Sequence, residues 1–416
     1  MKKGTEIKEV ISIELLNYIF ISLLMFLLIC PSMIQAQNIN NDFIRYSQEM
    51  EQGLSESLSV KDYRKTIRLL NDWFEKYYRQ DAATKANFQE GSIEMLMATC
   101  YFYLAEETAK DLKTDSTLIY LEKAISYGFI DYKSIKANAD FEFLNQEQRF
   151  ITLTESIKEK GDYLFVLKNS GHYTGSEAEV PMFEYKVSDI DLVKVKEYFN
   201  LDSIAGTGDE MSKILNLLNW AHGLIRHDGT KSCYETNAVD IYRFATENKC
   251  GVNCRALAVF LNECYLALGI KSRFITCNPK NYDDLDVHVI NHVFSGQLGK
   301  WVWIDPTYNL YVTDDKGSLL SIFEVREKII NDEEIRINEN ANWNNEKSIT
   351  KEEYIDNYMV KNLYWFQSAL VFSYNTESSG NFKKNRHIAL YPTGFNREVN
   401  QNTEVIVYDD IYFWER

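Results

Sequence analysis

The stretch Gly251-Val-Asn-Cys-Arg-Ala-Leu-Ala258 decides the fold of the second half of the chain. Its first residues favour a turn, and the apolar positions from Ala256 to Leu268 recur at helical spacing, so a buried helix is expected here. Asn253 is a suitable N-cap, which places Cys254 in the first turn. Unpaired backbone N–H groups and the helix dipole favour a thiolate at such a position.

Two strands are expected after this helix. The run His288-Val-Ile-Asn-His-Val-Phe294 alternates like a strand, and Lys300-Trp-Val-Trp-Ile-Asp-Pro-Thr307 reads as a second one stopped by proline. Gly296 and Gly299 lie between them, so the two strands can form a hairpin. Together with further strands at 270–277, at 363–374 and beyond residue 388, this pattern predicts an α+β domain with an antiparallel sheet.

The register of the hairpin decides which histidine meets Asp305. A turn centred on Gly296-Gln297 puts His288 opposite Asp305, with Cβ atoms about 5 Å apart. A turn at Leu298-Gly299 puts His292 there instead. Geometry favours the first register and leaves the second open. In either case a thiol, an imidazole and a carboxylate supply the nucleophile, base and orienting acid of an acyl-transfer site.

Four motifs carry a resemblance to a known family, and they are Gly-Val-Asn-Cys254-Arg-Ala-Leu-Ala, Leu268-Gly-Ile-Lys-Ser-Arg273, His288-x-x-Asn-x-Val-Phe and Trp303-Ile-Asp305-Pro-Thr. Over about residues 211–310 the chain resembles the transglutaminase-like superfamily. The resemblance implies a papain-like core with a triad of Cys254, His288 and Asp305. It also selects His288 over His292.

Members of this superfamily include protein cross-linking enzymes, cysteine peptidases and deglycosylating amidases. The expected function is therefore hydrolysis of amide bonds in peptides or proteins through a thioester on Cys254. Cross-linking by an amine acceptor is one alternative, and a catalytically inert peptide-binding or scaffolding protein is another. The mechanism requires no cofactor and no metal. His222 and His227 lie five residues apart, where facing helical ligands lie three or four apart, so structural roles are expected for both.

Residues 1–36 read as an export signal. Lys2 and Lys3 precede an uncharged apolar run at 18–30, which is too short to span a bilayer. Cleavage after Ala36 is favoured. Lipid attachment at Cys30 is not expected, because a bulky isoleucine precedes it. The sequence thus predicts an exported protein that is periplasmic, cell-surface or secreted, with a retained membrane anchor as the alternative to cleavage.

The composition excludes nucleic acid as a partner. The net charge is −16 over 416 residues, and the lysines and glutamates of residues 1–36 cancel, so the predicted mature chain is equally acidic. A chain this acidic has no electrostatic footprint for nucleic acid. The expected partner is a peptide or protein substrate.

The chain is expected to contain two domains after the signal. Residues 41–166 show apolar positions at helical spacing and resemble the helical hairpins of tetratricopeptide-like proteins, although an ordinary helical bundle fits as well. Such a domain could hold a protein partner. Turn-forming residues at 168–177 mark a linker, and residues 178–416 are assigned to the transglutaminase-like domain.

Overall fold

The computed structural model describes residues 40–174, 181–187, 189–231, 233–378, 387–397 and 404–415. The predicted export signal, with Cys30 and Ala36, lies outside these residues. The chain divides into two compact units, Met1–Asp162 and Tyr163–Arg416. The unit boundary falls four residues before the end expected for the helical domain, because the helix Tyr163–Lys168 packs with the second unit.

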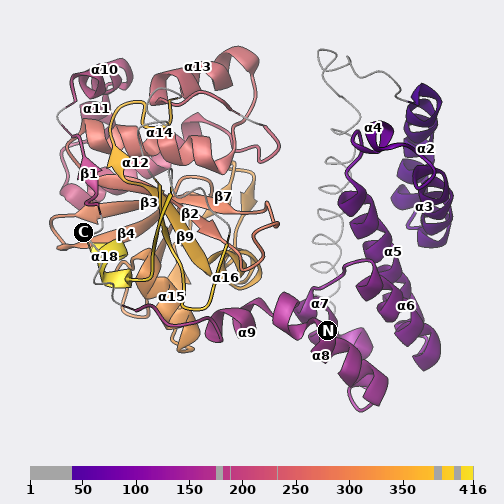
Figure 1. Ribbon diagram of the computed structural model, residues 1–416. Helices are drawn as coiled ribbons and strands as arrows, with labels where there is room; N and C mark the ends of the chain where they lie inside the picture. Colours follow the sequence, from indigo (N-terminus) through magenta and orange to yellow (C-terminus); the bar gives the residue numbers. More distant parts are fainter. Residues whose placement is uncertain are drawn as a thin grey trace. The chain divides into compact units, whose positions relative to one another are not determined.

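The first unit is helical in its described part (Figure 1). Its longest helix, α5, packs along α6 and against α3, and these contacts bury the side chains of Leu70, Trp73 and Leu121. A helical N-terminal region is therefore confirmed. Its elements are α2 (Asn41–Ser59), α3 (Tyr63–Tyr77), α4 (Ala82–Lys85), α5 (Glu90–Lys110), α6 (Thr114–Ser126), α7 (Tyr132–Lys136), η2 (Ala139–Leu144) and α8 (Gln148–Gly161).

The second unit combines helices with an eight-stranded sheet in the order β12-β11-β9-β2-β3-β4-β5-β6. The sheet strands are β2 (Ser272–Asn278), β3 (His288–Ser295), β4 (Lys300–Asp305), β5 (Leu310–Asp314), β6 (Ile335–Ile337), β9 (Trp365–Ala369), β11 (His387–Leu390) and β12 (Glu404–Val407). Short two-stranded pairs join β1 (Glu184–Tyr185) to β10 (Val371–Phe372) and β7 (Asn342–Trp343) to β8 (Lys347–Ser348). The helical elements are α9 (Tyr163–Lys168), α10 (Ile190–Phe199), α11 (Leu201–Ala205), α12 (Glu210–Leu224), α13 (Ala238–Asn248), α14 (Cys254–Ala267), α15 (Ile322–Ile330), η3 (Glu352–Met359), α16 (Val360–Asn362) and α18 (Asp410–Glu415).

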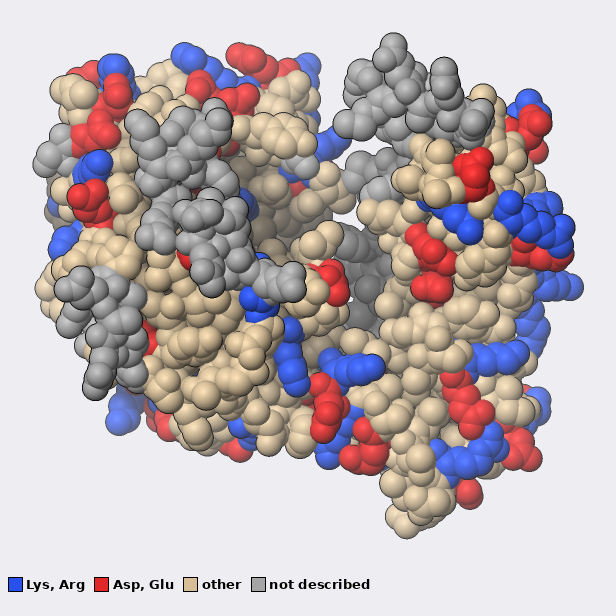
Figure 2. Space-filling view, viewed as in Figure 1, with Lys and Arg blue, Asp and Glu red and all other residues tan. Residues whose placement is uncertain are grey.

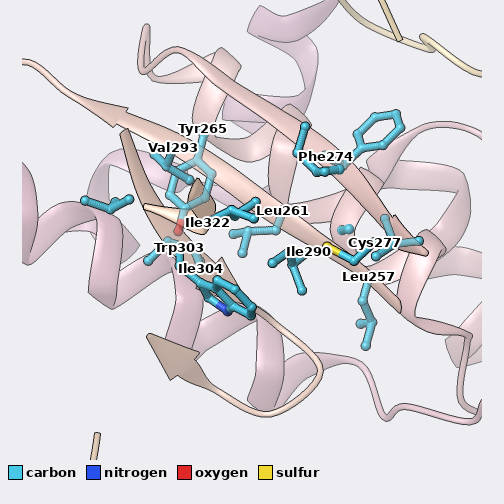
Figure 3. Packing of buried hydrophobic residues seen from close by; sticks show 14 of the residues in the cluster. Leu257, Leu261, Tyr265, Phe274, Cys277, Ile290, Val293, Trp303, Ile304 and Ile322 are labelled. Carbon is cyan, nitrogen blue, oxygen red and sulfur yellow. The ribbon is translucent and has the colours of Figure 1, made fainter. Parts of the chain in front are cut away.

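The core of this unit lies where α14 packs on β2 and β3 (Figure 3). Leu257, Leu261 and Tyr265 recur at a spacing of four on one side of the helix, and they meet Ile290 and Val293 of the sheet. All five are buried. Because α14 is buried along almost its whole length, the position of its first residue is fixed relative to the strands.

The predicted α+β class is confirmed, with two local corrections. The pair β11–β12 is parallel within an otherwise antiparallel sheet. The sequence predicts strands beyond residue 388, but the C-terminal run Tyr412-Phe-Trp414 lies in helix α18. Phe413 is completely buried, so packing against the core, rather than a readable period, determines the conformation of this short segment.

On the face that Figure 2 shows, acidic and basic side chains are interspersed over the surface of both units. Among the helices of the described residues, none has both the length and the apolar character needed to cross a bilayer.

Candidate active site

Cys254 is the first residue of α14. Asn253 is the N-cap, as expected, and its side-chain oxygen accepts a hydrogen bond from the backbone N–H of Ala256 at 3.0 Å. Cys254 is partly exposed, whereas Cys264 and Cys277 are buried. The thiol therefore lies in the partial positive charge of a capped helix N-terminus, which favours the thiolate.

His288 begins β3 and Asp305 ends β4, and their side chains meet. His288 Nε2 lies 2.7 Å from Asp305 Oδ2, and both residues are almost completely buried. The same carboxylate oxygen accepts a hydrogen bond from the Tyr354 hydroxyl at 2.6 Å, and Oδ1 accepts one from the Thr307 N–H at 2.8 Å. Both oxygens of the carboxylate are thus held by hydrogen bonds. Because Asp305 contacts Nε2 of His288, Nδ1 of the imidazole remains for another group.

Cys254 lies on the other side of the imidazole, close enough that each of the two groups shifts the pKa of the other. The structure therefore brings together the three residues that the sequence analysis singles out. The imidazole lies between the thiol and the carboxylate, with one ring nitrogen for each. This is the order in which a base is placed between a nucleophile and an orienting acid.

Both registers considered for the hairpin are wrong. The ladder pairs Asn291 with Ile304 and Ser295 with Lys300, so the loop contains residues 296–299 instead of a two-residue turn. His288 and Asp305 are therefore diagonal neighbours on one face, still within reach of each other because both side chains project from that face. His292 pairs with Trp303 in the ladder, and its ring stacks on Trp301 at 5.0 Å.

The electrostatics favour charge separation between thiol and imidazole. Burial raises the pKa of Cys254, but hydrogen bonds to His227 and His288 outweigh it and lower the pKa from 9.0 to about 6. Burial opposes the charged form of His288 too, yet the Asp305 carboxylate and the bond to Cys254 raise its pKa above 6.5. A thiolate–imidazolium pair is therefore the favoured state at neutral pH.

Aromatic residues enclose the imidazole. The ring of His288 lies 5.4 Å from that of Tyr358, 5.9 Å from that of Tyr308 and 6.3 Å from that of Tyr354. Tyr354 and Tyr358 both come from η3, a π-helical segment. Such helices are rare and are frequent at functional sites. Here the segment delivers one hydroxyl to the carboxylate and one ring to the base.

Asn291 fixes the strand of the base against the helix of the thiol. It is completely buried, and its side-chain N–H donates to the backbone carbonyl of Ala258 at 2.9 Å. This bond connects β3, which begins with His288, to the second turn of the helix that begins with Cys254. It explains why an asparagine three residues after the histidine forms part of the sequence motif.

The two other histidines of this region differ in role. His222 is buried, with Nδ1 3.0 Å from the Pro306 carbonyl and Nε2 2.8 Å from Asn342 Oδ1, so its structural interpretation fits. His227 instead lies close to Cys254 and acts to lower the pKa of its thiol. The described residues contain no group of three or more histidine, cysteine, aspartate or glutamate side chains that could hold a metal ion.

Sequence reasoning missed His227 and Tyr354. His227 lies three residues after the end of α12 and 27 positions before Cys254, in a run that gives no sign of contact with the thiol. Tyr354 lies 49 positions after Asp305, in a segment for which no secondary structure was predicted. Only the tertiary fold brings either residue to the site.

The part of the chain that contains this site matches the model of a known protein family. Residues 199–306 match the model of the transglutaminase-like superfamily, and this range contains all three candidate residues. Comparison with curated proteins gives no match. Among solved structures the chain is similar to a protein from Cytophaga hutchinsonii named a "putative cysteine protease", with 18% identity and a TM-score of 0.23. That alignment covers 44% of this chain and 53% of the other, so the chain spans about half of that protein's length.

Proposed function

We propose that the protein is an exported cysteine enzyme that hydrolyses amide bonds of peptides or proteins. The match of residues 199–306 to the transglutaminase-like superfamily supports this proposal. One observation carries the proposal. His288 Nε2 lies 2.7 Å from the buried carboxylate of Asp305, and the same imidazole lowers the pKa of the Cys254 thiol against the effect of burial. This arrangement supports a triad of Cys254, His288 and Asp305.

In the first half of the reaction, the sulfur of Cys254 attacks the carbonyl carbon of the amide. The S–C bond forms and the π electrons of the carbonyl move to oxygen. His288, which holds the thiol proton, donates it to the leaving amine as the C–N bond breaks. Asp305 and Tyr354 keep the imidazole oriented during the transfer. The product of this half-reaction is a thioester on Cys254 and a free amine.

In the second half, His288 accepts a proton from water, and the hydroxide attacks the thioester carbon. The C–S bond breaks, a carboxylic acid leaves and the thiolate is restored. If an amine takes the place of water, the same thioester gives an isopeptide bond, which is the cross-linking alternative. Because only the acceptor differs, the two reactions are separated by their products.

A product analysis tests the proposal. The purified chain from residue 37 is incubated in H₂¹⁸O with casein and a labelled primary amine, and the products are examined by mass spectrometry. Hydrolysis predicts new carboxyl groups that carry ¹⁸O, and cross-linking predicts amine incorporation at glutamine. Both must disappear in Cys254→Ala. Failure of the wild type to give either product, while Cys254 remains a free thiol, favours the inert binding protein.

Export is a separate part of the proposal. It is tested by N-terminal sequencing of the protein recovered from cell fractions. A mature chain that begins at Gln37 outside the cytoplasm agrees with it. An intact Met1 in the cytoplasm contradicts it.

A further inference from the structure

His227 occupies a position beside the nucleophile that is built by the backbone. The N–H of Asp228 donates to the carbonyl of Val252 at 2.8 Å, and the N–H of Val252 donates to the carbonyl of Arg226 at 2.9 Å. His227 and Val252 thus form a parallel bridge. Because Val252 lies two residues before Cys254, this bridge sets the His227 side chain next to the start of α14.

The β7–β8 hairpin holds the same segment from the other side. Asn344, at the turn of this hairpin, accepts a hydrogen bond from the His227 N–H at 2.7 Å and donates one to the His227 carbonyl at 3.0 Å. Arg226 pairs with Glu346 of the same turn at 2.7 Å. The backbone of His227 is therefore fixed on both edges.

Trp343 fixes the tautomer of the His227 ring. Its indole N–H donates to His227 Nδ1 at 3.1 Å. An indole nitrogen only donates, so Nδ1 must carry a lone pair, and the proton of the neutral ring lies on Nε2. A proton on both nitrogens would bring Nδ1–H against the indole N–H. The nitrogen left for Cys254 is therefore Nε2, a donor.

The two imidazoles at the thiol are thus built for different tasks. His288 has a carboxylate behind it, which stabilises the positive charge of a proton acceptor. His227 has an N–H donor behind it, and this donor does not stabilise a positive charge on the ring. His288 is suited to take a proton from sulfur, and His227 is suited to donate a hydrogen bond toward negative charge.

We propose that Nε2–H of His227, together with the backbone N–H of Cys254, donates to the oxyanion that forms when Cys254 attacks a carbonyl. The inference rests on the proposed function and names a catalytic residue beyond the triad. The Cys254 N–H lies at the first position of α14, where it has no partner within the helix. In the tetrahedral intermediate the oxygen is separated from Sγ by one carbon, so a donor in contact with the sulfur is also near the oxygen.

No proton is transferred to or from His227 in this step. As the S–C bond forms, the negative charge moves from sulfur to oxygen, and the Nε2–H bond follows it. When the intermediate collapses, the electron pair returns to the carbonyl and the leaving group departs. The contribution of His227 is therefore confined to reactions that pass through an oxyanion.

Two reactions of the same thiol separate this role from others. Acylation of Cys254 by p-nitrophenyl acetate passes through a tetrahedral oxyanion, whereas alkylation by iodoacetamide displaces iodide and forms none. Both rates are measured on the full mature chain at a pH above the midpoint of the thiol in each variant. His227→Phe is expected to slow acylation about 10²–10³-fold, the loss that follows removal of one oxyanion donor, and to change alkylation by less than about threefold.

Two further variants keep the test decisive if His227→Phe is poorly folded. His227→Gln retains an N–H donor and is expected to recover at least about tenfold of the lost acylation rate. Trp343→Phe removes the partner that fixes the tautomer and is expected to slow acylation about threefold to tenfold, again without an effect on alkylation. Each variant is checked for folding by its melting temperature.

Each combination of acylation and alkylation results leads to a different conclusion. A selective loss of acylation in His227→Phe with recovery in His227→Gln supports the inference. An equal loss of both reactions assigns His227 to the thiol itself, and no loss of either assigns it to packing; both results overturn the inference while Cys254 remains a reactive nucleophile. A wild type that neither reagent modifies at Cys254 overturns the proposed function, and the inference with it.

Discussion

His288 and Asp305 bind each other from positions that the β3–β4 ladder does not pair. Their side chains meet at 2.7 Å, yet the ladder places Asn291 opposite Ile304, so the two residues are diagonal neighbours at the end of the hairpin. The contact is maintained by groups outside the hairpin. Tyr354 and Thr307 hold the carboxylate, and Cys254 holds the far side of the imidazole.

The first prediction concerns the carboxylate. Asp305→Asn keeps the shape of the side chain but replaces an acceptor with an amide, so the imidazole loses both its orientation and the charge that stabilises its protonated form. The turnover number is expected to fall about 10³–10⁴-fold. Steady-state kinetics on the substrate found by product analysis measure it. A loss below tenfold with intact folding would contradict the role of Asp305.

The second prediction concerns the tyrosine behind the carboxylate. Tyr354→Phe removes the hydroxyl that donates to Asp305 at 2.6 Å. A hydrogen bond to a charged group contributes about 1.5–3 kcal/mol, so a comparable fall in the free energy of unfolding is expected, together with about tenfold lower turnover. Urea denaturation and kinetics measure the two effects.

Tyr265→Phe is the matched control for this variant. Tyr265 is also a completely buried tyrosine, and its hydroxyl donates to the Ile214 carbonyl at 2.9 Å, away from any carboxylate. It is expected to lower stability with turnover unchanged. If both variants lose turnover equally, the effect of Tyr354 is one of packing alone.

The third prediction concerns the glycine that permits the bridge beside His227. A Cβ at Gly251 would lie 2.8 Å from the carbonyl oxygen of Arg226 and 2.8 Å from Cβ of Asp228. Both contacts are too close, so Gly251→Ala must move the segment that carries His227. It is expected to cost about 1–3 kcal/mol of stability and to slow acylation of Cys254. Thermal unfolding and p-nitrophenyl acetate kinetics measure these effects.

Gly223→Ala provides the comparison. Gly223 lies in α12, where an added Cβ meets no atom within 4 Å. Alanine favours a helix over glycine by about 1 kcal/mol, so this variant should be as stable as the wild type or more so. Equal behaviour of the two alanine variants would show that the close approach at Gly251 has no consequence.

Much of this site could be predicted from local sequence. The turn before Cys254, its cap at Asn253 and the stripe of apolar residues in the helix are local signals, and the structure agrees with all of them. The alternating residue pattern that begins at His288 correctly predicted strand β3. The resemblance to a family selected this histidine, and the structure places it against Asp305 although the predicted register was wrong.

The remainder depends on tertiary contacts. The hairpin register depends on a four-residue loop in which Gly299 adopts a positive φ of 66°, and the two glycines of the loop allowed more than one turn. His227 reaches Cys254 through a bridge between segments 25 positions apart. Tyr354 reaches Asp305 from a π-helix, a conformation that has no distinctive sequence period. None of these features could be derived from spacing.

Activation of Cys254 by His288 must show in the pH dependence of alkylation. The rate at which iodoacetamide modifies Cys254 is measured from about pH 4 to pH 10 by mass spectrometry of the labelled peptide. Because only the thiolate reacts, the rate must fall as the pH drops below the pKa of the thiol.

The wild type is expected to show a midpoint near the Cys254 pKa of about 6. In His288→Ala the hydrogen bond and the positive charge that lower this pKa are lost, so the midpoint should move by at least about one pH unit toward the ordinary value. A wild-type midpoint near 9.0, the ordinary value for a thiol, with no change in His288→Ala, would show that His288 does not activate Cys254.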